Sequence, residues 1–296
     1  MIIIPGPTAI ELGKEVSNLI ENSKIIEVLY KQFPDGEDYI QIQGNVENDN
    51  VLVIQTTFPE QDKCLMQLFL MLEAISEMNP KSISIVIPYF AYSRQDKRFK
   101  PGEALSAKVI STTIKTLAGN LLDKVITFDI HSEIILDFFE GKAKNISAME
   151  LFGHYFKKLN VKNVFCLAPD KTATPRAEKI ARILDCEYSY LEKIRDLTTG
   201  EVTTKVKDLN VGNKNVIIAD DIISTGGTMI KAIKMLKSQG ANDIYVCATH
   251  ALLIGDSKSN IFKAGAKEII GTNTIQNEYS KVSIASLIAK EFNNIP

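Results

Sequence analysis

Short apolar runs alternate with longer amphipathic stretches along the chain. An apolar run at residues 51–56 is followed by an amphipathic stretch at 64–78 and a second apolar run at 82–89. The apolar runs have the length and β-branched content of buried strands, and the stretch between them has the length of a helix. The same alternation returns after residue 160, where we predict strands at 164–169, 215–220, 243–249 and 268–273. This order predicts an α/β fold with mostly parallel sheets flanked by helices.

The two halves of the chain resemble each other. Residues 45–51 read NVENDNV and residues 210–216 read NVGNKNV, so five of seven positions agree, and each segment leads into an apolar strand. With a small gap, the apolar run at 82–89 aligns with the run at 243–250. We therefore predict two similar α/β domains with a boundary near residues 141–147. The predicted domains are residues 1–145 and residues 146–296.

Composition and charge exclude several partners. Of the 296 residues, 45% are apolar and 24% are charged, and the net charge of −2 offers no basic surface for a nucleic acid. The N-terminal apolar run breaks at Pro5 and Gly6 without a preceding basic region, which is too short for a signal peptide or a membrane span. We expect a cytoplasmic protein that binds neither nucleic acid nor membrane.

Four cysteines are spread along the chain without a CxxC pair. The spacing fits neither a disulfide framework nor a zinc site. We expect them to be reduced thiols, mostly in the core. They are Cys64, Cys166, Cys186 and Cys247.

The segment VIIADDIISTGGT, residues 216–228, combines features of a ligand site. A buried strand is predicted to end at Asp220 and Asp221, and a loop of small residues then opens a helix. In parallel sheets, ligands bind at the carboxyl ends of strands. Backbone N–H groups and hydroxyls at the start of a helix can hold a phosphate, and the two carboxylates suit ribose hydroxyls. The loop residues are Ser224, Thr225, Gly226, Gly227 and Thr228.

The acidic pair distinguishes the two halves. In the internal alignment, Asp220 and Asp221 fall opposite Gln55 and Thr56. Only the second half therefore carries the acidic pair. We expect the second domain to hold a phosphosugar and the first to have diverged to another task.

The 216–228 segment resembles the phosphoribosyl-binding motif of the phosphoribosyltransferase superfamily. The resemblance implies two phosphoribosyltransferase-like domains and a 5-phosphoribosyl ligand. Two enzyme classes remain open on this motif. Phosphoribosyltransferases consume phosphoribosyl diphosphate, whereas ribose-phosphate diphosphokinases make it from ATP and ribose 5-phosphate.

Over essentially its whole length, the chain is similar to the ribose-phosphate diphosphokinases. The turn FPDGE resembles their adenine-binding hairpin, which implies ATP contacts from Phe33, Asp35 and Glu37. The segment YSRQDKR resembles their RQD segment. It implies ATP phosphate and base contacts from Arg94, Gln95 and Asp96.

Metal and catalytic roles also follow from this resemblance. His131, in the strand-end segment DIHS, and Asp170, at the end of VFCLAPD, would organise Mg²⁺. Many members have a glycine pair after this aspartate, whereas this chain reads Lys171 to Thr174. The segment KIR would place Lys193 and Arg195 in the catalytic loop, where two cations stabilise the charge of phosphoryl transfer.

The resemblance implies in-line attack by the C1 hydroxyl of ribose 5-phosphate on the β-phosphorus of MgATP, giving phosphoribosyl diphosphate and AMP. The sequence leaves open whether Asp220, Asp221 or no enzymic group is the base. The first domain would handle ATP and the second ribose 5-phosphate. The adenine hairpin would reach a neighbouring subunit's site, so a homodimer or larger homo-oligomer with shared active sites is expected.

Two rival functions remain. A phosphoribosyltransferase acting on a base or amine would leave the FPDGE, RQD and KIR segments without a purpose. A catalytically silent regulatory homologue would not need the suitable side chains that stand at every position the chemistry requires.

Overall fold

Two compact units make up the described chain. The computed structural model describes residues 1–195, 202–204 and 209–293. One unit comprises Met1–Ile146 together with Ser283–Pro296, and the other comprises Ser147–Val282. The predicted boundary near 141–147 falls at this division. The predicted second domain, 146–296, is wrong at its end, because the C-terminal segment belongs to the first unit.

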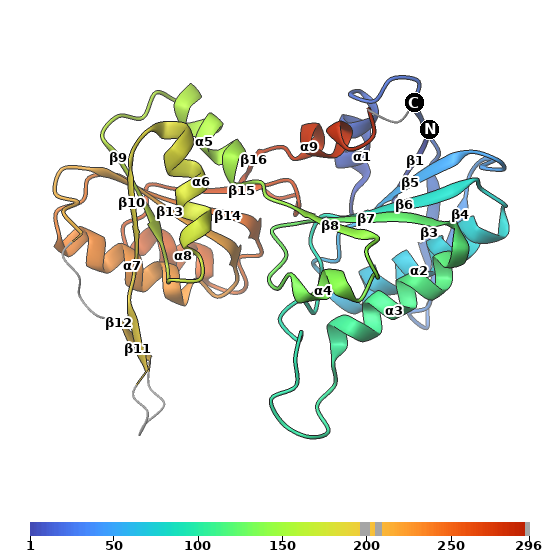
Figure 1. The fold of residues 1–296 in the computed structure, drawn as a ribbon, viewed down its shortest axis with the longest axis horizontal. Helices are drawn as coiled ribbons and strands as arrows, with labels where there is room; N and C mark the ends of the chain where they lie inside the picture. Colours follow the sequence, from blue (N-terminus) through green and yellow to red (C-terminus); the bar gives the residue numbers. More distant parts are fainter. Residues whose placement is uncertain (196–201, 205–208, 294–296) are drawn as a thin grey trace. The chain divides into compact units, whose positions relative to one another are not determined.

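The first unit is a parallel six-stranded sheet with helices on both faces (Figure 1). Its strand order is β2-β1-β5-β6-β7-β8. The strands are β1 (Ile2–Pro5), β2 (Lys24–Ile25), β5 (Asn50–Ile54), β6 (Ser82–Ile87), β7 (Leu122–Phe128) and β8 (Ala143–Ile146). The helices are α1 (Ile10–Ser17), α2 (Gln61–Glu77), α3 (Ser106–Ala118), α4 (Ile134–Asp137) and α9 (Ala285–Lys290), with a short 3-10 turn at Gly119–Leu121. An antiparallel hairpin, β3 (Val28–Gln32) with β4 (Asp38–Ile42), follows β2.

The second unit has a sheet of the same kind. Its strand order is β10-β9-β13-β14-β15-β16, and all of its pairs are parallel. The strands are β9 (Val164–Ala168), β10 (Glu187–Tyr190), β13 (Asn215–Ile223), β14 (Ile244–Ala251), β15 (Glu268–Thr272) and β16 (Ser280–Val282). The helices are α5 (Met149–Lys158), α6 (Thr174–Leu184), α7 (Gly227–Ser238) and α8 (Ser257–Lys263). A hairpin, β11 (Lys193–Arg195) with β12 (Val202–Thr204), follows β10.

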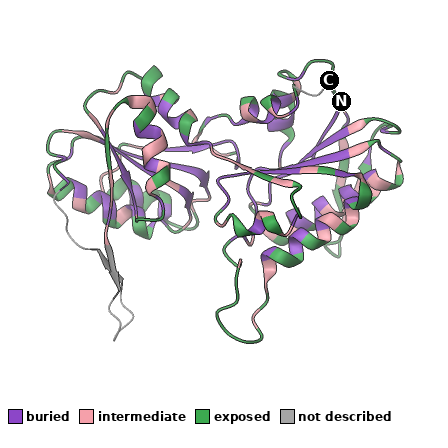
Figure 2. Cartoon of the chain, in the orientation of Figure 1, coloured by how far each residue is buried: buried purple, intermediate pink, exposed green. Residues whose placement is uncertain are grey.

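Alternating side chains bury both faces of the second sheet. In β13, Val216 and Ile218 pack in one cluster with α7 and α8, whereas Ile217 and Ala219 pack in another with α5 and α6. Successive residues of a strand point to opposite faces, so a strand covered on both sides must be apolar throughout. Figure 2 shows the strands as the buried centre of each unit. Among helices of the described chain, none combines the length and apolar character that a bilayer crossing requires.

The strand registers confirm that the two units are similar. Val51 pairs with Ile83 in the first sheet, and Val216 pairs with Ile244 in the second. The internal sequence alignment places Val51 opposite Val216 and Ile83 opposite Ile244, so the aligned residues form equivalent pairs in the two sheets. Both sheets also have the same order when their strands are numbered from the start of each unit. The predicted architecture, two similar α/β domains with mostly parallel sheets, is confirmed.

The C-terminal segment returns to the first unit because α1 needs a packing partner. In the second unit α6 packs against α5, which precedes the first strand of that unit. In the first unit α9 packs against α1. Asn293 donates to the backbone oxygen of Leu19 at 3.1 Å, and Lys144 forms an ion pair with Glu291 at 2.7 Å. Ile288 and Ala289 of α9 are buried in this packing.

Gly153 offers a stability test, because α5 and α6 approach most closely there. A Cβ at Gly153 would lie 2.6 Å from the Cβ of Ile183. We expect Gly153→Ala to lower the free energy of unfolding by about 1–3 kcal/mol through overpacking, although alanine favours helix. Urea denaturation followed by circular dichroism measures the change. Gly227→Ala is the matched control, because a Cβ at Gly227 meets no atom within 4 Å, and equal losses in both variants would contradict this account.

Candidate functional site

Two adjacent aspartates lie inside a strand of the second unit. The sequence placed Asp220 and Asp221 at a strand end, but β13 continues to Ile223, which still pairs with β14. Asp221 is buried, with 4% of its surface exposed, and Asp220 is half-buried. Two neighbouring carboxylates in such a place need a compensating cation.

Arg176 supplies that cation from the first turn of α6. Its Nη1 lies 3.2 Å from Oδ1 of Asp220, and its Nη2 lies 3.1 Å from Oδ2 of Asp221. The two nitrogens of one guanidinium thus bridge both carboxylates, a geometry that lysine cannot reproduce. Burial, followed by the charge of Asp221, still raises the pKa of Asp220 well above its ordinary value, although Arg176 opposes this.

The sequence interpretation missed Arg176. One signal was available, because a cation near the start of a helix is opposed by the helix dipole and therefore suggests a specific acidic partner. Arg176 also follows Asp170 closely, so it lies near the end of the neighbouring strand β9. The partner itself could not be identified from sequence spacing.

The loop after β13 is shaped by two glycines with different roles. Gly226 has a φ of 77°, and a Cβ there would lie 3.0 Å from Cδ1 of Ile261, so the fold itself requires glycine. Gly227 begins α7, and a Cβ there would meet nothing within 4 Å. Packing therefore does not explain Gly227, whereas close approach of a ligand would.

The start of α7 is suited to an anion. Its first N–H groups have no partner within the helix, and the helix dipole places partial positive charge at this end. Ser224 is half-buried, and Thr225 and Thr228 are exposed, so hydroxyls stand beside the exposed Gly227. The predicted loop residues 224–228 are therefore together at one helix end, directly after the acidic pair.

Asp170 follows β9 and is held by its own loop. Its Oδ1 accepts hydrogen bonds from the Thr172 hydroxyl at 2.6 Å and from the Ala173 N–H at 3.1 Å. The side chain is half-buried. Because β9 and β13 are neighbouring strands, Asp170 and the acidic pair belong to the same carboxyl edge of the sheet.

The equivalent position in the first unit is filled by protein. Gln55 corresponds to Asp220 in the aligned sheets and is fully buried. Its Oε1 accepts from the Thr8 N–H at 3.3 Å, and its Nε2 donates to Oε1 of Gln67 at 3.2 Å. A Cβ at Gly6 would lie 2.2 Å from Oε1 of Gln55, so glycine makes room for this amide. The first unit thus replaces the acidic pair with a closed amide network.

The predicted RQD segment lies between β6 and α3. Arg94 and Gln95 are exposed and Asp96 is half-buried. The Gln95 N–H donates to the backbone oxygen of Tyr92 at 2.9 Å, which forms a turn, and Tyr92 has a φ of 62°. The Tyr92 hydroxyl donates to Asp62 of α2, and this hydrogen bond raises the pKa of Tyr92. The exposed Arg94 is therefore presented from an anchored turn.

His131 follows β7, the strand next to β6. It is exposed, whereas the preceding Asp129 is buried, with 7% exposure. The Ile130 N–H donates to Oδ1 of Asn145 at 3.0 Å. Because β6 and β7 are paired in parallel, His131 and the Arg94 segment follow the same carboxyl edge of the first sheet.

Phe33 lies at the tip of the β3–β4 hairpin with 41% of its surface exposed. The Phe33 N–H donates to the backbone oxygen of Glu37 at 2.8 Å, and the Glu37 N–H donates to Oδ1 of Asp35 at 3.2 Å. The ring makes an edge contact with Tyr39, with 6.2 Å between centroids. An exposed aromatic ring beside two carboxylates can stack on a planar ligand.

Lys193 and Arg195 form the ends of β11, which pairs antiparallel with β12. The structure describes only the backbone of these two residues, so the predicted roles of their side chains stay predictions. The β11–β12 hairpin follows β10 as the β3–β4 hairpin follows β2. The predicted catalytic cations and the predicted adenine contacts therefore belong to hairpins that follow equivalent strands in the two units.

Each unit thus gathers its own set of predicted site residues. The second unit brings together Asp170, the acidic pair, Arg176 and the loop 224–228. The first unit brings the Arg94 segment and His131 to one sheet edge. Across the described ranges there is no ready-made group of three or more metal-ligating His, Cys, Asp or Glu side chains.

Comparisons with known proteins agree with this architecture. Residues 1–118 match the family described as the N-terminal domain of ribose phosphate pyrophosphokinase, and residues 137–280 match the phosphoribosyl transferase domain. The chain is 42% identical to a ribose-phosphate pyrophosphokinase of Sulfolobus acidocaldarius over 97% of both chains. It is 41% identical to that of Pyrococcus abyssi over 98% of both chains.

A solved structure extends the likeness to the whole fold. The phosphoribosylpyrophosphate synthetase of Mycobacterium smegmatis superimposes with a TM-score of 0.85 at 26% sequence identity, covering 98% of this chain and 96% of that one. Both domains are therefore matched, and the sequence relatives cover nearly the full length. The chain belongs to the ribose-phosphate pyrophosphokinase family.

Proposed function

We propose that this protein transfers the β,γ-diphosphoryl group of MgATP to the C1 hydroxyl of ribose 5-phosphate, giving phosphoribosyl diphosphate and AMP. The observation that carries this proposal is the arrangement in the second unit, where a bridged acidic pair leads directly into an open helix start. A sugar with a phosphate at one end matches this combination. Membership of the pyrophosphokinase family supports the direction of the reaction.

The second unit binds ribose 5-phosphate in this proposal. The 224–228 loop holds the 5-phosphate through N–H groups and hydroxyls, and the missing Cβ at Gly227 admits it. Asp220 and Asp221 accept from the ribose hydroxyls. Arg176 keeps both carboxylates in place before the sugar arrives, because it already bridges them at hydrogen-bonding distance.

The first unit handles ATP. Phe33 stacks on adenine, and Asp35 and Glu37 accept from the base or its ribose. Arg94 binds phosphate oxygens with its guanidinium, and Gln95 and Asp96 orient the nucleotide. Support comes from the exposure of Phe33 and Arg94, which leaves both side chains available to a ligand.

Magnesium fits the donors at Asp170. This ion prefers oxygen ligands and commonly takes one or two carboxylates together with substrate phosphates. A half-buried carboxylate, oriented by Thr172 and Ala173, meets that need without a larger cluster. His131 offers a nitrogen, which magnesium accepts less readily, so its proposed place is beside the ATP phosphates that accompany the ion. Bound magnesium neutralises charge on these phosphates.

Positioning and charge stabilisation supply most of the catalysis in this proposal. The C1 hydroxyl attacks the β-phosphorus in line, and AMP leaves. In this proposal Lys193 and Arg195, which both belong to β11, stabilise the charge of the transferred group. The raised pKa of Asp220 favours proton acceptance by this carboxylate.

We further propose a homodimer or larger assembly in which the β3–β4 hairpin contributes to a neighbouring subunit's site. The hairpin is antiparallel and separate from the six-stranded sheet, which allows it to reach another chain.

All four cysteines are free thiols, which fits the reducing cytoplasm.

Substrate-dependent AMP release is the direct test of the proposed reaction. Purified protein with Mg²⁺, ATP and ribose 5-phosphate should release AMP in amounts equal to phosphoribosyl diphosphate, as followed by chromatography. Omitting ribose 5-phosphate should stop AMP release. No AMP across divalent ions and phosphate concentrations would sink the proposal and favour a catalytically silent homologue.

Asp220→Asn should separate function from stability. Because the folded-state pKa of Asp220 is raised, the charged carboxylate costs stability as pH rises through that pKa, and a neutral amide removes the cost. The variant should be more stable than the parent at neutral pH, with a difference that shrinks toward acidic pH. Its kcat/KM for ribose 5-phosphate should fall about 100-fold or more.

Urea denaturation at several pH values, with the AMP assay, measures both effects. Asp243→Asn is a matched control, because Asp243 pairs with Lys267 in an exposed ion pair. It should leave kcat/KM unchanged and should change the free energy of unfolding by no more than about 0.5 kcal/mol. An Asp220→Asn variant with parental activity would remove Asp220 from the proposed site.

Subunit sharing can be tested by mixing inactive variants. Phe33→Ala should impair ATP binding and Asp221→Ala should impair ribose 5-phosphate binding. If the hairpin serves a neighbouring site in a dimer, a randomly mixed population should regain about a quarter of parental activity. About half of the dimers are then mixed, and one of the two sites in each mixed dimer receives both intact parts. Mass spectrometry verifies mixing, and verified mixed assemblies without recovery would show that sites are not shared.

A further inference from the structure

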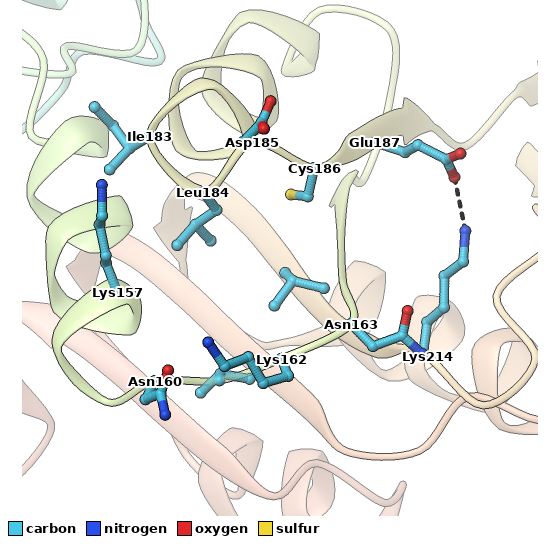
Figure 3. Close-up of a pocket in the computed structure, with 12 residues that line it drawn as sticks. Lys157, Asn160, Lys162, Asn163, Ile183, Leu184, Asp185, Cys186, Glu187 and Lys214 are labelled. Carbon is cyan, nitrogen blue, oxygen red and sulfur yellow. Dashed lines mark hydrogen bonds and ion pairs between the residues drawn. The ribbon is translucent and has the colours of Figure 1, made fainter.

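A cavity lies at the amino ends of strands in the second sheet, opposite the carboxyl ends that the candidate site follows. It has a volume of about 720 Å³ and is bordered by the amino ends of β9 and β10 (Figure 3). The site described above follows the carboxyl ends of β9 and β13, so the cavity is separate from it. Its lining includes three lysines, two acids and a thiol. These are Lys157, Lys162, Lys214, Asp185, Glu187 and Cys186.

Two cysteines meet at this cavity. Cys186 is half-buried and contributes to the cavity lining. Its Sγ lies 3.7 Å from Sγ of Cys166, which is fully buried in β9. Cys64 and Cys247 are also buried. Cys186 is therefore the most accessible of the four thiols, and its Sγ contacts that of the buried Cys166.

The contact makes the two thiols unequal. The hydrogen bond from Cys166 lowers the pKa of Cys186, and the same hydrogen bond together with burial raises the pKa of Cys166. Burial, Asp185 and Glu187 oppose this lowering of the Cys186 pKa, and Lys214 adds to it. Lys157 and Lys162 add further positive charge around the cavity. The accessible thiol is thus favoured as the thiolate, which is the nucleophilic form.

We propose that Cys186 and Cys166 form a thiol oxidation site, in which Cys186 reacts with a hydroperoxide and Cys166 resolves the product to a disulfide. The Cys186 thiolate attacks one oxygen of the hydroperoxide, an S–O bond forms, and the O–O bond breaks. The released alkoxide or hydroxide takes a proton from solvent. The product is a sulfenic acid, in which sulfur is oxidised and the peroxide is reduced.

Resolution follows from the position of Cys166. Its sulfur attacks the sulfenic sulfur, an S–S bond forms, and the S–O bond breaks. The leaving hydroxide takes the Cys166 proton, so water is released. The net reaction converts two thiols and one hydroperoxide to a disulfide, an alcohol or water, and water. The sulfurs must approach from the observed 3.7 Å to about 2.05 Å. Because Cys166 is held within β9, this approach falls to Cys186 and the segment before β10.

The bond would join two segments that lead to the proposed active site. β9 carries Cys166 and is followed by Asp170, and Cys186 precedes β10, which is followed by the β11–β12 hairpin. The helix between them, α6, carries Arg176. A disulfide would therefore close a loop that contains both Asp170 and Arg176.

Hydrogen peroxide and peptide mass spectrometry test the proposal on the complete protein. After brief exposure at neutral pH, remaining thiols are alkylated and the protein is digested. We expect a Cys166–Cys186 disulfide that is reversed by dithiothreitol. In the unmutated folded protein, iodoacetamide should label Cys186 about tenfold or more faster than the other three cysteines.

Two variants define the separate roles. In Cys166→Ser, Cys186 should stop at the sulfenic acid, which dimedone traps. In Cys247→Ser, the control with a buried thiol in the same sheet, the disulfide should form as in the parent. Labelling of Cys186 no faster than Cys64, or peroxide treatment that leaves no Cys166–Cys186 bond in the parent, would overturn the proposal. Both of these measurements use the unmutated protein and do not depend on a variant folding.

Discussion

Two adjacent carboxylates in a buried strand require a cation, and the bridge from Arg176 to Asp220 and Asp221 meets that requirement. The bridge connects α6 to β13 across the edge where the proposed ribose site lies. Its two contacts, at 3.2 and 3.1 Å, lie within hydrogen-bonding distance. Yet the pKa of Asp220 remains raised, so the cation does not fully offset burial and like charge. This pair costs stability that its chemistry requires, as expected at a functional site.

The two units show how one architecture supports two tasks. Both have the same strand order and the same register between their central strands. The difference lies in a few side chains at equivalent positions. Asp220 is half-buried beside an open helix start, whereas Gln55 is buried in an amide network that occupies the equivalent space. The sheet therefore fixes where a site can form, and the side chains at its carboxyl ends distinguish the unit with the proposed ribose site from the other unit.

The second sheet presents different chemistry at its two edges. At the carboxyl edge, the start of α7 and the missing side chain of Gly227 suit a phosphate. At the amino edge, lysines and acids surround Cys186, and Cys166 reaches it from the core. The α6 helix runs between these edges, from near Arg176 to Leu184 beside the cavity.

Local sequence pattern predicted the α/β fold, the two similar domains and the central strands of both sheets, whereas the phosphate loop stays a prediction. These features depend on neighbouring residues, through periodicity, turn chemistry and the arrangement of small and acidic side chains. The tertiary structure alone decided the return of α9 to α1, the bridge from Arg176 to Asp220, and the contact between Cys166 and Cys186. The last two join residues 44 and 20 positions apart, and no local pattern records such partners. The sequence alone showed that Gln55 stands where the second unit has Asp220. Only the packing showed that its amide bonds to Thr8 and Gln67 and fills the equivalent space. Contacts of this kind arise when strands and helices assemble, because only then are distant side chains brought within bonding distance.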